Sequence, residues 1–339
     1  MYYLICFILT FVISLILTPI MRTIALKLNI LDIPHSNIKT HKIPTPYLGG
    51  VSIAISFWVG LTFIRILTSF PTGTLRSLRG IFLGSLIIFI LGLIDDIKKD
   101  GLNFRLKFFV QISAAILIIF YGIKIEFIKP EWFGLIITTI WIVGITNSLN
   151  IIDIMDGLSS GIAIIASLGF FFIGLPSEEK IYVNFASIAL AGSCLGFLPY
   201  NLSQKFKIFM GDTGSLLIGF ILSSISLGTR YTDVNNIGLF APILILAIPI
   251  YDTFLVIYFR WKKGISPFLG SKDHFALRLE KMGYSRKKIL VLTYICGIIL
   301  SVISFLVTIT KFYYALTLFI LTFLIALFFA FKLGEIEVE

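Results

Sequence analysis

Long apolar runs recur along nearly the whole chain, and a run of about 17–23 residues is long enough to cross a lipid bilayer as a helix. Only 14% of the 339 residues are charged, whereas about a quarter are charged in a typical soluble domain. The sequence therefore predicts an all-α integral membrane protein, with residues 1–339 forming a single polytopic domain. Eleven transmembrane helices are expected, at about residues 2–20, 47–68, 80–94, 106–123, 132–151, 158–175, 183–200, 213–229, 237–259, 288–309 and 312–331.

Basic residues indicate the orientation, because Lys and Arg are enriched in cytoplasmic loops. If the N-terminus lies outside, 20 of the 28 Lys and Arg residues fall in inner segments, and the C-terminus is cytoplasmic. The first apolar run has no basic segment before it and no A-x-A cleavage site after it, which favours a retained helix over a signal peptide. The net charge of +10 is then mainly a topology signal and gives little support for nucleic-acid binding.

Polar residues gather in the inner segments, whereas the outer loops are short and plain. The five polar segments lie at about residues 21–46, 95–107, 152–157, 201–212 and 260–288. We therefore expect an active site on the cytoplasmic face of a bacterial inner (plasma) membrane. The cysteines give no competing signal: Cys6, Cys194 and Cys296 lie far apart in predicted spans, which argues against a disulfide framework or a zinc site.

Asp95 and Asp96 are adjacent carboxylates at the end of the third expected span. Two such groups repel each other unless a cation or protonation relieves them. A solvated helix end is the alternative, but acids at a helix C-terminus oppose the helix dipole. The pair is therefore interpreted as functional, and its oxygen ligands suit Mg²⁺ shared with substrate phosphates.

Asn147, Asn150, Asp153 and Asp156 recur at a spacing of three across the end of the fifth expected span. Neighbours in this set share a helix face, but the whole set winds half around it, which predicts a helix end that loosens into a turn. Polar groups at the end of an apolar span are costly unless they are satisfied. Asp156 is placed to cap the sixth span, with Gly157 after it, whereas capping does not explain the other three.

Three further features leave alternatives open. Residues 44–50, Pro-Thr-Pro-Tyr-Leu-Gly-Gly, are a stiff turn or part of the site. Asp212, between Gly211 and Thr213, is a simple N-cap or part of a metal–phosphate cradle at a helix N-terminus. Asp252 is an acid inside the ninth span, so it is functional or paired, with a partner that the sequence does not identify.

Residues 272–282 have helical spacing and two distinct sides. Phe275, Leu279 and Met282 lie on one side, and His274, Arg278 and Lys281 lie on another. The segment is interpreted either as an amphipathic helix at the membrane surface or as a lid whose basic residues meet a diphosphate.

Taken in order, these motifs resemble a known family. They are Pro46-x-x-Gly49-Gly50, Asp95-Asp96, Asn147-x-x-Asn150-x-x-Asp153-x-x-Asp156-Gly157-Leu158, Phe209-Met210-Gly211-Asp212-x-Gly214-Ser215, and Ser266-Pro267-Phe268 ahead of His274. The chain is similar to the polyprenyl-phosphate N-acetylhexosamine-1-phosphate transferases, the family (glycosyltransferase family 4) of bacterial WecA, TagO and MraY. The match spans residues of about 20 to 290.

The resemblance implies transfer of an N-acetylhexosamine 1-phosphate, expected to be GlcNAc-1-phosphate, from a UDP-sugar to undecaprenyl or another polyprenyl phosphate, with release of UMP. This would be the first membrane step in making a cell-envelope glycan such as lipopolysaccharide or teichoic acid. The resemblance also implies Mg²⁺, with Mn²⁺ as the expected substitute. The implied catalytic residues are Asp95, Asp96, Asp153, Asp156 and His274; the metal ligands are Asp212 and Asn150; the substrate-binding residues are Lys42, Lys99, Lys107, Asn147, Asn150, Asn201, Phe209 (against the uracil) and Arg278.

Two departures from the family pattern bear on the donor. Ile154 stands where the family usually has the first Gly of Asp-Gly-x-Asp-Gly, and His274 is followed by Ala276 and Leu277 where the family has further histidines. Arg278 is expected to replace the lost charge. The second departure favours WecA and TagO over MraY, the phospho-MurNAc-pentapeptide transferase, which stays an alternative. Alternatives of another class are a secondary transporter and a non-catalytic lipid-binding relative, and a homodimer is a further expectation.

Overall fold

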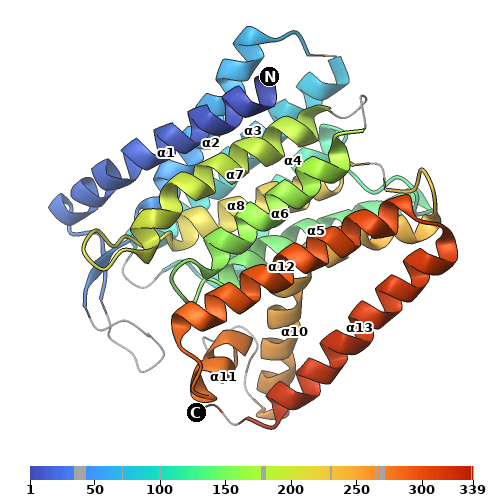
Figure 1. Cartoon of the computed structure of the whole chain (residues 1–339). Coiled ribbons are helices and arrows are strands. Elements are labelled where there is room, and N and C mark those ends of the chain that lie inside the picture. Colours follow the sequence, from blue (N-terminus) through green and yellow to red (C-terminus); the bar gives the residue numbers. More distant parts are fainter. Residues whose placement is uncertain are drawn as a thin grey trace.

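The computed structural model describes residues 1–33, 43–70, 72–98, 101–176, 181–229, 231–264, 266, 272–336 and 338. Within these residues the regular structure is almost wholly helical, which confirms the predicted all-α class (Figure 1). The elements are α1 (Tyr2–Lys27), β1 (Leu31–Asp32), β2 (Thr45–Pro46), α2 (Gly49–Leu67), α3 (Thr72–Ile97), α4 (Phe104–Phe120), α5 (Glu131–Ile151), α6 (Leu158–Gly174), α7 (Ile181–Leu202), α8 (Gly211–Ser226), η1 (Asn236–Phe240), α9 (Ala241–Ile245), α10 (Ala247–Lys262), α11 (Phe275–Lys281), α12 (Arg286–Ile309) and α13 (Phe312–Gly334).

Each expected span coincides with a helix, or with a broken helix at residues 237–259. By length and composition, seven helices in the described part of the chain could cross a membrane, or eight if the bent pair at Asn236–Lys262 is one span. The apolar helix α6 is shorter, at 17 residues. These helices make the chain a multi-pass membrane protein, whereas the number of eleven spans and the orientation of the termini stay predictions.

The ninth expected span is a broken helix in the structure and not a continuous one. α9 ends at Ile245, and α10 follows after Leu246 with a bend of 72°. Pro249 lies in the first turn of α10. A proline has no N–H for the carbonyl four residues earlier, here that of Ile245, and its ring clashes with that carbonyl. This proline therefore disfavours a straight helix, and α10 crosses the direction of the other long helices (Figure 1).

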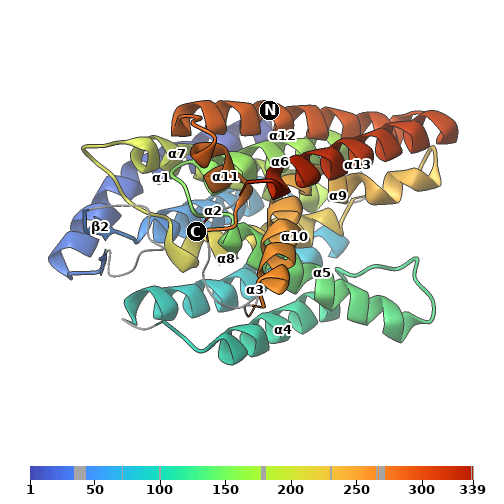
Figure 2. The same ribbon diagram turned by 90° about the horizontal axis from the view of Figure 1, so that it is seen from below.

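The centre of the bundle is α8, whose residues from Thr213 to Ser226 are all buried. A helix that is apolar all round belongs inside a bundle, and α8 packs chiefly against α3 and α5. α1 packs on α7, where a Cβ on Gly192 would lie 2.6 Å from the carbonyl oxygen of Phe7. The close approach at Gly192 therefore serves packing between two helices of this chain. α1 and α13 lie at opposite sides of the bundle (Figures 1 and 2).

Helix ends from several hairpins meet at one end of the bundle. α3, α5 and α7 end there, and α4, α6 and α8 begin there, as expected for consecutive antiparallel helices. The two-stranded β1–β2 ribbon joins them, with Leu31 opposite Pro46 and Asp32 opposite Thr45. These connections carry the motifs found in the sequence, so the fold gathers residues that are far apart along the chain.

Candidate active site at the helix ends

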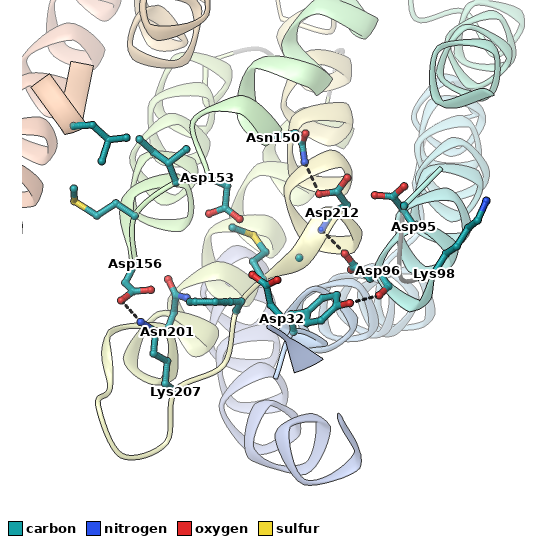
Figure 3. Close-up of a pocket in the computed structure, with 18 of the residues that line it drawn as sticks. Asp32, Asp95, Asp96, Lys98, Asn150, Asp153, Asp156, Asn201, Lys207 and Asp212 are labelled. Carbon is teal, nitrogen blue, oxygen red and sulfur yellow. Dashed lines mark hydrogen bonds and ion pairs between the residues drawn. The ribbon is translucent and has the colours of Figure 1, made fainter. Parts of the chain in front are cut away.

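A cavity of about 450 Å³ lies among these helix ends, and all five polar segments contribute to its walls (Figure 3). Asp153 and Asp156 lie on one side of it, and Asp95 and Lys98 lie on the other. The structure therefore brings together the segments that the sequence predicted to act together. The lining residues are Asp32, Tyr47, Asp95, Asp96, Lys98, Gly101, Asn150, Asp153, Ile154, Met155, Asp156, Asn201, Lys207, Phe209, Met210, Gly211, Asp212, Leu277 and Arg286.

Asp212 lies in the first turn of α8, between the two sides of the cavity (Figure 3). Its Oδ1 accepts a hydrogen bond from the amide of Asn150 at 2.9 Å, and the same amide nitrogen donates to Ser215 Oγ at 2.9 Å. Its Oδ2 is 2.8 Å from Lys107 Nζ. The end of α5 and the start of α4 thus hold this carboxylate from two directions.

Lys107 joins Asp212 to Asp95. Its Nζ is 2.6 Å from Asp95 Oδ2, and Asp95 also accepts a hydrogen bond from the backbone N–H of Leu102 at 2.5 Å. One ammonium therefore compensates two carboxylates that would otherwise repel each other. The side chain of Lys107 remains 23% exposed, but it is its partners Asp95 and Asp212, and not Lys107 itself, that line the cavity.

Asp96 has a different environment from Asp95, although the two are adjacent. It is 6% exposed, and its carboxylate accepts hydrogen bonds from the backbone N–H groups of Asp212 (2.8 Å) and Thr213 (3.0 Å). The hydroxyl of Thr213 also donates to it. The carbonyl oxygen of Asp96 accepts a hydrogen bond from Tyr47. Asp96 thus faces the start of α8, whereas Asp95 faces Lys107.

The Pro46-x-x-Gly49-Gly50 motif supports the segment before Asp212. The backbone N–H of Gly49 donates to the carbonyl of Phe209 at 3.0 Å, and that of Gly50 donates to Met210 at 2.8 Å. A Cβ on Gly50 would lie 2.5 Å from the Cα of Gly214, so only glycine allows the two backbones to approach this closely. The structure therefore supports the interpretation of residues 44–50 as part of the site, where they hold the segment before Asp212 in place.

The Asn–Asp series lies on a helix end and a turn, as predicted, but its members diverge. Asn147 donates to Gln111 Oε1 at 2.6 Å and to the carbonyl of Val143 at 2.7 Å, so it joins α5 to α4 and does not line the cavity. α5 ends at Ile151, and Asp153 lies in the turn that follows. Burial, and then the charges of Asp212 and Asp156, raise the pKa of Asp153 to about 8.

The prediction that Asp156 caps the sixth span is wrong. Gly157 is the N-cap of α6, with φ of +79°, and its N–H is bound by Asn201 Oδ1 at 2.6 Å. Asp156 instead pairs with Lys207, at 2.6 Å. The left-handed backbone at Gly157 turns the chain so that Asp156 faces the cavity, and α6 has no side-chain cap.

Lys207 is a cavity residue that sequence reasoning missed, because it was counted only as an inner charge. Its Nζ lies 4.9 Å from the ring centre of Phe209 and pairs with Asp156. Its position two residues before Phe209 was the available signal. Asn201 contacts the same loop, since its amide nitrogen donates to the carbonyl of Ile208 at 3.0 Å. Asn201, Phe209 and Lys207 therefore form one side of the cavity with the Asp153–Asp156 turn.

His274 and Arg278 neither join the carboxylate cluster nor line the cavity, so the interpretation of a lid that meets a diphosphate stays a prediction. His274 is 5% exposed and pairs with Asp252, the intramembrane acid whose partner the sequence did not identify. Arg278 is 2% exposed and pairs with Asp273 at 2.9 Å. It also donates to the carbonyl of Leu333 at 2.9 Å, so α11 is tied to the end of α13.

The amphipathic pattern predicted for residues 272–282 is also altered. Phe275 and Arg278 are both buried, whereas Met282 is exposed. Leu277, which stands where the family has a further histidine, lines the cavity, and so does Ile154. The remaining predicted basic residues, Lys42 and Lys99, lie outside the described residues.

The oxygen ligands at this end of the bundle fit Mg²⁺. Within the described residues, no three His, Cys, Asp or Glu side chains form a ready metal cage, but Mg²⁺ is usually held by one or two carboxylates plus substrate phosphates. The ammonium of Lys107 between Asp95 and Asp212 shows that the local charge favours a cation. Asp212 fits as the metal ligand. Asn150 points its amide nitrogen at Asp212, so it would have to turn its Oδ1 inward to coordinate a metal.

Comparison with known proteins places the chain in a family. A family model described as glycosyl transferase family 4 matches residues 78–230. The chain is 35% identical over 307 residues to the probable undecaprenyl-phosphate N-acetylglucosaminyl 1-phosphate transferase of Bacillus subtilis (strain 168), covering 88% of this chain and 83% of that protein. It is 30% identical over 316 residues to the decaprenyl-phosphate N-acetylglucosaminephosphotransferase of Mycobacterium tuberculosis (strain ATCC 25618 / H37Rv), covering 84% and 77%.

A third relative has a different donor in its name. The chain is 38% identical over 271 residues to the phospho-N-acetylmuramoyl-pentapeptide-transferase of Prochlorococcus marinus (strain MIT 9312), covering 70% of each protein. The family-model match includes Asp95, Asp96 and Asp212, which the structure brings to one cavity. On these grounds the chain belongs to glycosyl transferase family 4.

Proposed function

We propose that this protein transfers N-acetylglucosamine 1-phosphate from UDP-GlcNAc to a polyprenyl phosphate, such as undecaprenyl phosphate, and releases UMP. The observation that carries the proposal is the pair of cavity-lining carboxylates, Asp95 and Asp212, that Lys107 joins at the ends of the helices. The Bacillus subtilis and Mycobacterium tuberculosis relatives, whose names specify this transfer, support it. The active site would face the cytoplasm, where the soluble donor is present.

The reaction joins two anions. An oxygen of the lipid phosphate attacks the β-phosphorus of the donor, a new P–O bond forms, and the bond from that phosphorus to the oxygen bridging to the α-phosphate breaks. UMP leaves with that oxygen. Mg²⁺ held by Asp212 would neutralise charge on the diphosphate and on the leaving group.

The residues of the chain supply the remaining charge control. Lys107 offers positive potential beside the position of attack, and preorganised charges of this kind act strongly in a water-poor site. Asp95, whose partner is Lys107, would keep the acceptor phosphate deprotonated. We favour direct attack by the lipid phosphate, since a phosphate monoester is already partly dianionic near neutral pH. UMP release without acceptor lipid, or a phosphosugar adduct on Asp95 or Asp96, would contradict direct attack.

The other side of the cavity suits the nucleotide. Phe209 offers an aromatic face for the uracil, and Lys207 lies above this ring and near the expected diphosphate. The lipid chain would lie among the membrane helices, which explains why an enzyme with a soluble donor needs so much membrane-embedded structure.

Transfer can be tested with purified protein in detergent, radiolabelled UDP-GlcNAc, undecaprenyl phosphate and Mg²⁺. Label in an organic-extractable product, with stoichiometric UMP, is the expected result. Asp212→Asn should abolish the transfer, whereas Lys124→Met, at the other end of α4, should not. No labelled lipid from the wild type with UDP-GlcNAc, UDP-GalNAc, UDP-diNAc-bacillosamine or UDP-MurNAc-pentapeptide would overturn the proposal. Preference for the last donor would favour the activity named for the Prochlorococcus relative.

A further inference from the structure

The two adjacent aspartates at the end of α3 contact different parts of the molecule. Asp95 contacts Lys107 and the N–H of Leu102, at the edge of the cavity. Asp96 contacts the first turn of α8, where the N–H groups have no partners within the helix. The sequence treats the two as one pair, but the structure gives each a separate set of partners.

Asp96 acts as the N-cap of α8, although it belongs to another helix. An N-cap side chain usually comes from the residue just before the helix, but here that residue is Met210, which makes no side-chain cap. The two oxygens of Asp96 accept from Asp212 N, Thr213 N and Thr213 Oγ1. A carboxylate at this place also interacts favourably with the positive end of the helix dipole.

The surroundings of Asp96 leave little room for it to turn towards a substrate. A Cβ added to Gly211 would lie 2.9 Å from the Cγ of Asp96, so the backbone of α8 is already in contact with the carboxylate. One turn earlier on α3, a Cβ on Gly92 would lie 2.6 Å from the Cα of Thr213. The backbones of α3 and α8 therefore touch at this point, and Asp96 is enclosed between them.

We infer that Asp96 is a positioning residue that fixes the metal-binding carboxylate of Asp212, and that the acceptor phosphate is activated by Asp95 with Lys107. The carboxylate of Asp96 accepts a hydrogen bond from the backbone N–H of Asp212. The cap therefore fixes the position of the Asp212 backbone, from which its carboxylate extends into the cavity. The inference rests on the proposed function for the assignment of Asp95. The role of Asp96 in positioning Asp212 affects cation binding, which can be measured without turnover.

The test compares Asp95→Asn with Asp96→Asn in the full-length protein. In Asp96→Asn one accepting oxygen becomes an amide that faces an N–H group, so the start of α8 should shift. We expect at least a tenfold rise in the Mg²⁺ concentration for half-maximal transfer. At saturating Mg²⁺ the rate should return to within tenfold of wild type, with the KM for undecaprenyl phosphate changed less than threefold. Asp95→Asn should lose transfer at least a thousandfold at every Mg²⁺ concentration.

Binding of Mn²⁺ to the purified protein, followed by electron paramagnetic resonance, gives a readout apart from activity. Asp96→Asn should weaken Mn²⁺ binding about tenfold, and Asp95→Asn should weaken it less than threefold. Unchanged Mn²⁺ binding in Asp96→Asn, with transfer lost at all Mg²⁺ concentrations, would overturn the inference, because Asp96 would then act on the substrate. If the wild type bound Mn²⁺ as expected but transferred no sugar, the proposed function would fail while the positioning of Asp212 stood.

Thr213 provides a second variant in case Asp96→Asn does not fold. Thr213→Ala removes one of the three donors to Asp96 and should weaken Mn²⁺ binding about threefold. Ser223→Ala, which removes another buried hydroxyl from α8 that bonds only within the helix, is the matched control and should leave Mn²⁺ binding unchanged. Equal effects of the two variants would count against the inference.

Discussion

His274 Nδ1 lies 2.8 Å from the Oδ2 of Asp252, and both side chains are buried. The other carboxylate oxygen of Asp252 accepts the backbone N–H of Phe275 at 2.8 Å. An acid in an apolar helix thereby finds two donors at the start of α11, and the last long loop is fixed to α10. The histidine that the family resemblance implied to be catalytic is engaged in holding this loop.

Loss of this pair should destabilise the protein. In His274→Ala, Asp252 keeps the backbone N–H of Phe275 as a donor but loses the imidazole of His274. A buried acceptor left unpaired costs about 1–3 kcal/mol of stability. We expect a lower unfolding temperature in detergent, with partial recovery in His274→Asn, whose amide can donate from nearly the same place. An unchanged unfolding temperature with abolished transfer would show that His274 acts on the substrate.

Lys107→Met should change cation binding and catalysis in opposite directions. Without the ammonium, Asp95 and Asp212 repel each other, so a divalent cation should bind more tightly. Transfer should fall about 100–1000-fold, the usual loss when one preorganised stabilising group is removed. Mn²⁺ titration and transfer assays on the same samples measure both effects. Lys124→Met removes a lysine that pairs with Glu131 at the other end of α4 and should change neither.

Asp153 predicts how stability depends on pH in the absence of divalent cations. Burial and the nearby Asp212 and Asp156 raise its pKa to about 8 from an unfolded value of 3.8. Between these two values the folded state holds a proton that the unfolded state has lost, so stability falls as pH rises towards 8. The slope from this group is at most about 1.4 kcal/mol per pH unit. Asp153→Asn should remove this slope, so its unfolding temperature should exceed that of the wild type increasingly from pH 6 to pH 8. A constant difference would contradict the raised pKa.

Gly92→Ala should force α3 and α8 apart. The added Cβ would meet the backbone of Asp212 and Thr213 at 2.6–2.7 Å, and backbone cannot move aside as a flexible side chain can. We expect a lower unfolding temperature and a loss of transfer of at least tenfold. Gly144→Ala on α5 is the matched control, since its Cβ would meet nothing within 4 Å. That variant should keep its activity and gain about 0.5–1 kcal/mol in helix stability.

Ile154 should affect which donor is accepted. It lines the cavity in the turn between Asp153 and Asp156, where the family usually has glycine. Ile154→Gly should enlarge this part of the cavity and raise the relative kcat/KM for UDP-MurNAc-pentapeptide over UDP-GlcNAc by about tenfold. One methylene group more or less in an apolar pocket typically changes the ratio of kcat/KM between two substrates by about 10–200-fold. A donor panel assayed on both proteins decides the point, and an unchanged ratio would place Ile154 away from the sugar.

The sequence predicts the elements of this site better than the contacts among them. Apolar runs and charge bias identify the helices and the polar end of the bundle, because these depend on composition along the chain. The proline in the first turn of α10 could also have been recognised as a break, since its effect on the helix is local. Features that depend on residues close together in the sequence, such as the position of a helix or of a break in it, can therefore be predicted from the sequence.

The partners of the acidic residues depend on how helices are placed against one another. Asp96 lies 116 residues from Asp212, whose N–H it binds, and Asp156 lies 51 residues from Lys207. No local pattern sets the relative rotation and depth of α3 and α8, so the sequence could not tell Asp95 from Asp96. The prediction that Asp156 caps α6 failed for the same reason, since Asp156 is paired by Lys207 from the loop after α7.

The central position of α8 also has a consequence for the order of events during synthesis. The carboxylate of Asp96 on α3 leaves the ribosome more than a hundred residues before the helix that it caps. Until α8 enters the space between α3 and α5, Asp96 has no helix end to bind, and Lys107 lacks the second of the two carboxylates that it pairs with, that of Asp212. A nascent chain that stops after α7 therefore contains most of the motifs but not the assembled cavity, and the late arrival of one buried helix completes the proposed active site.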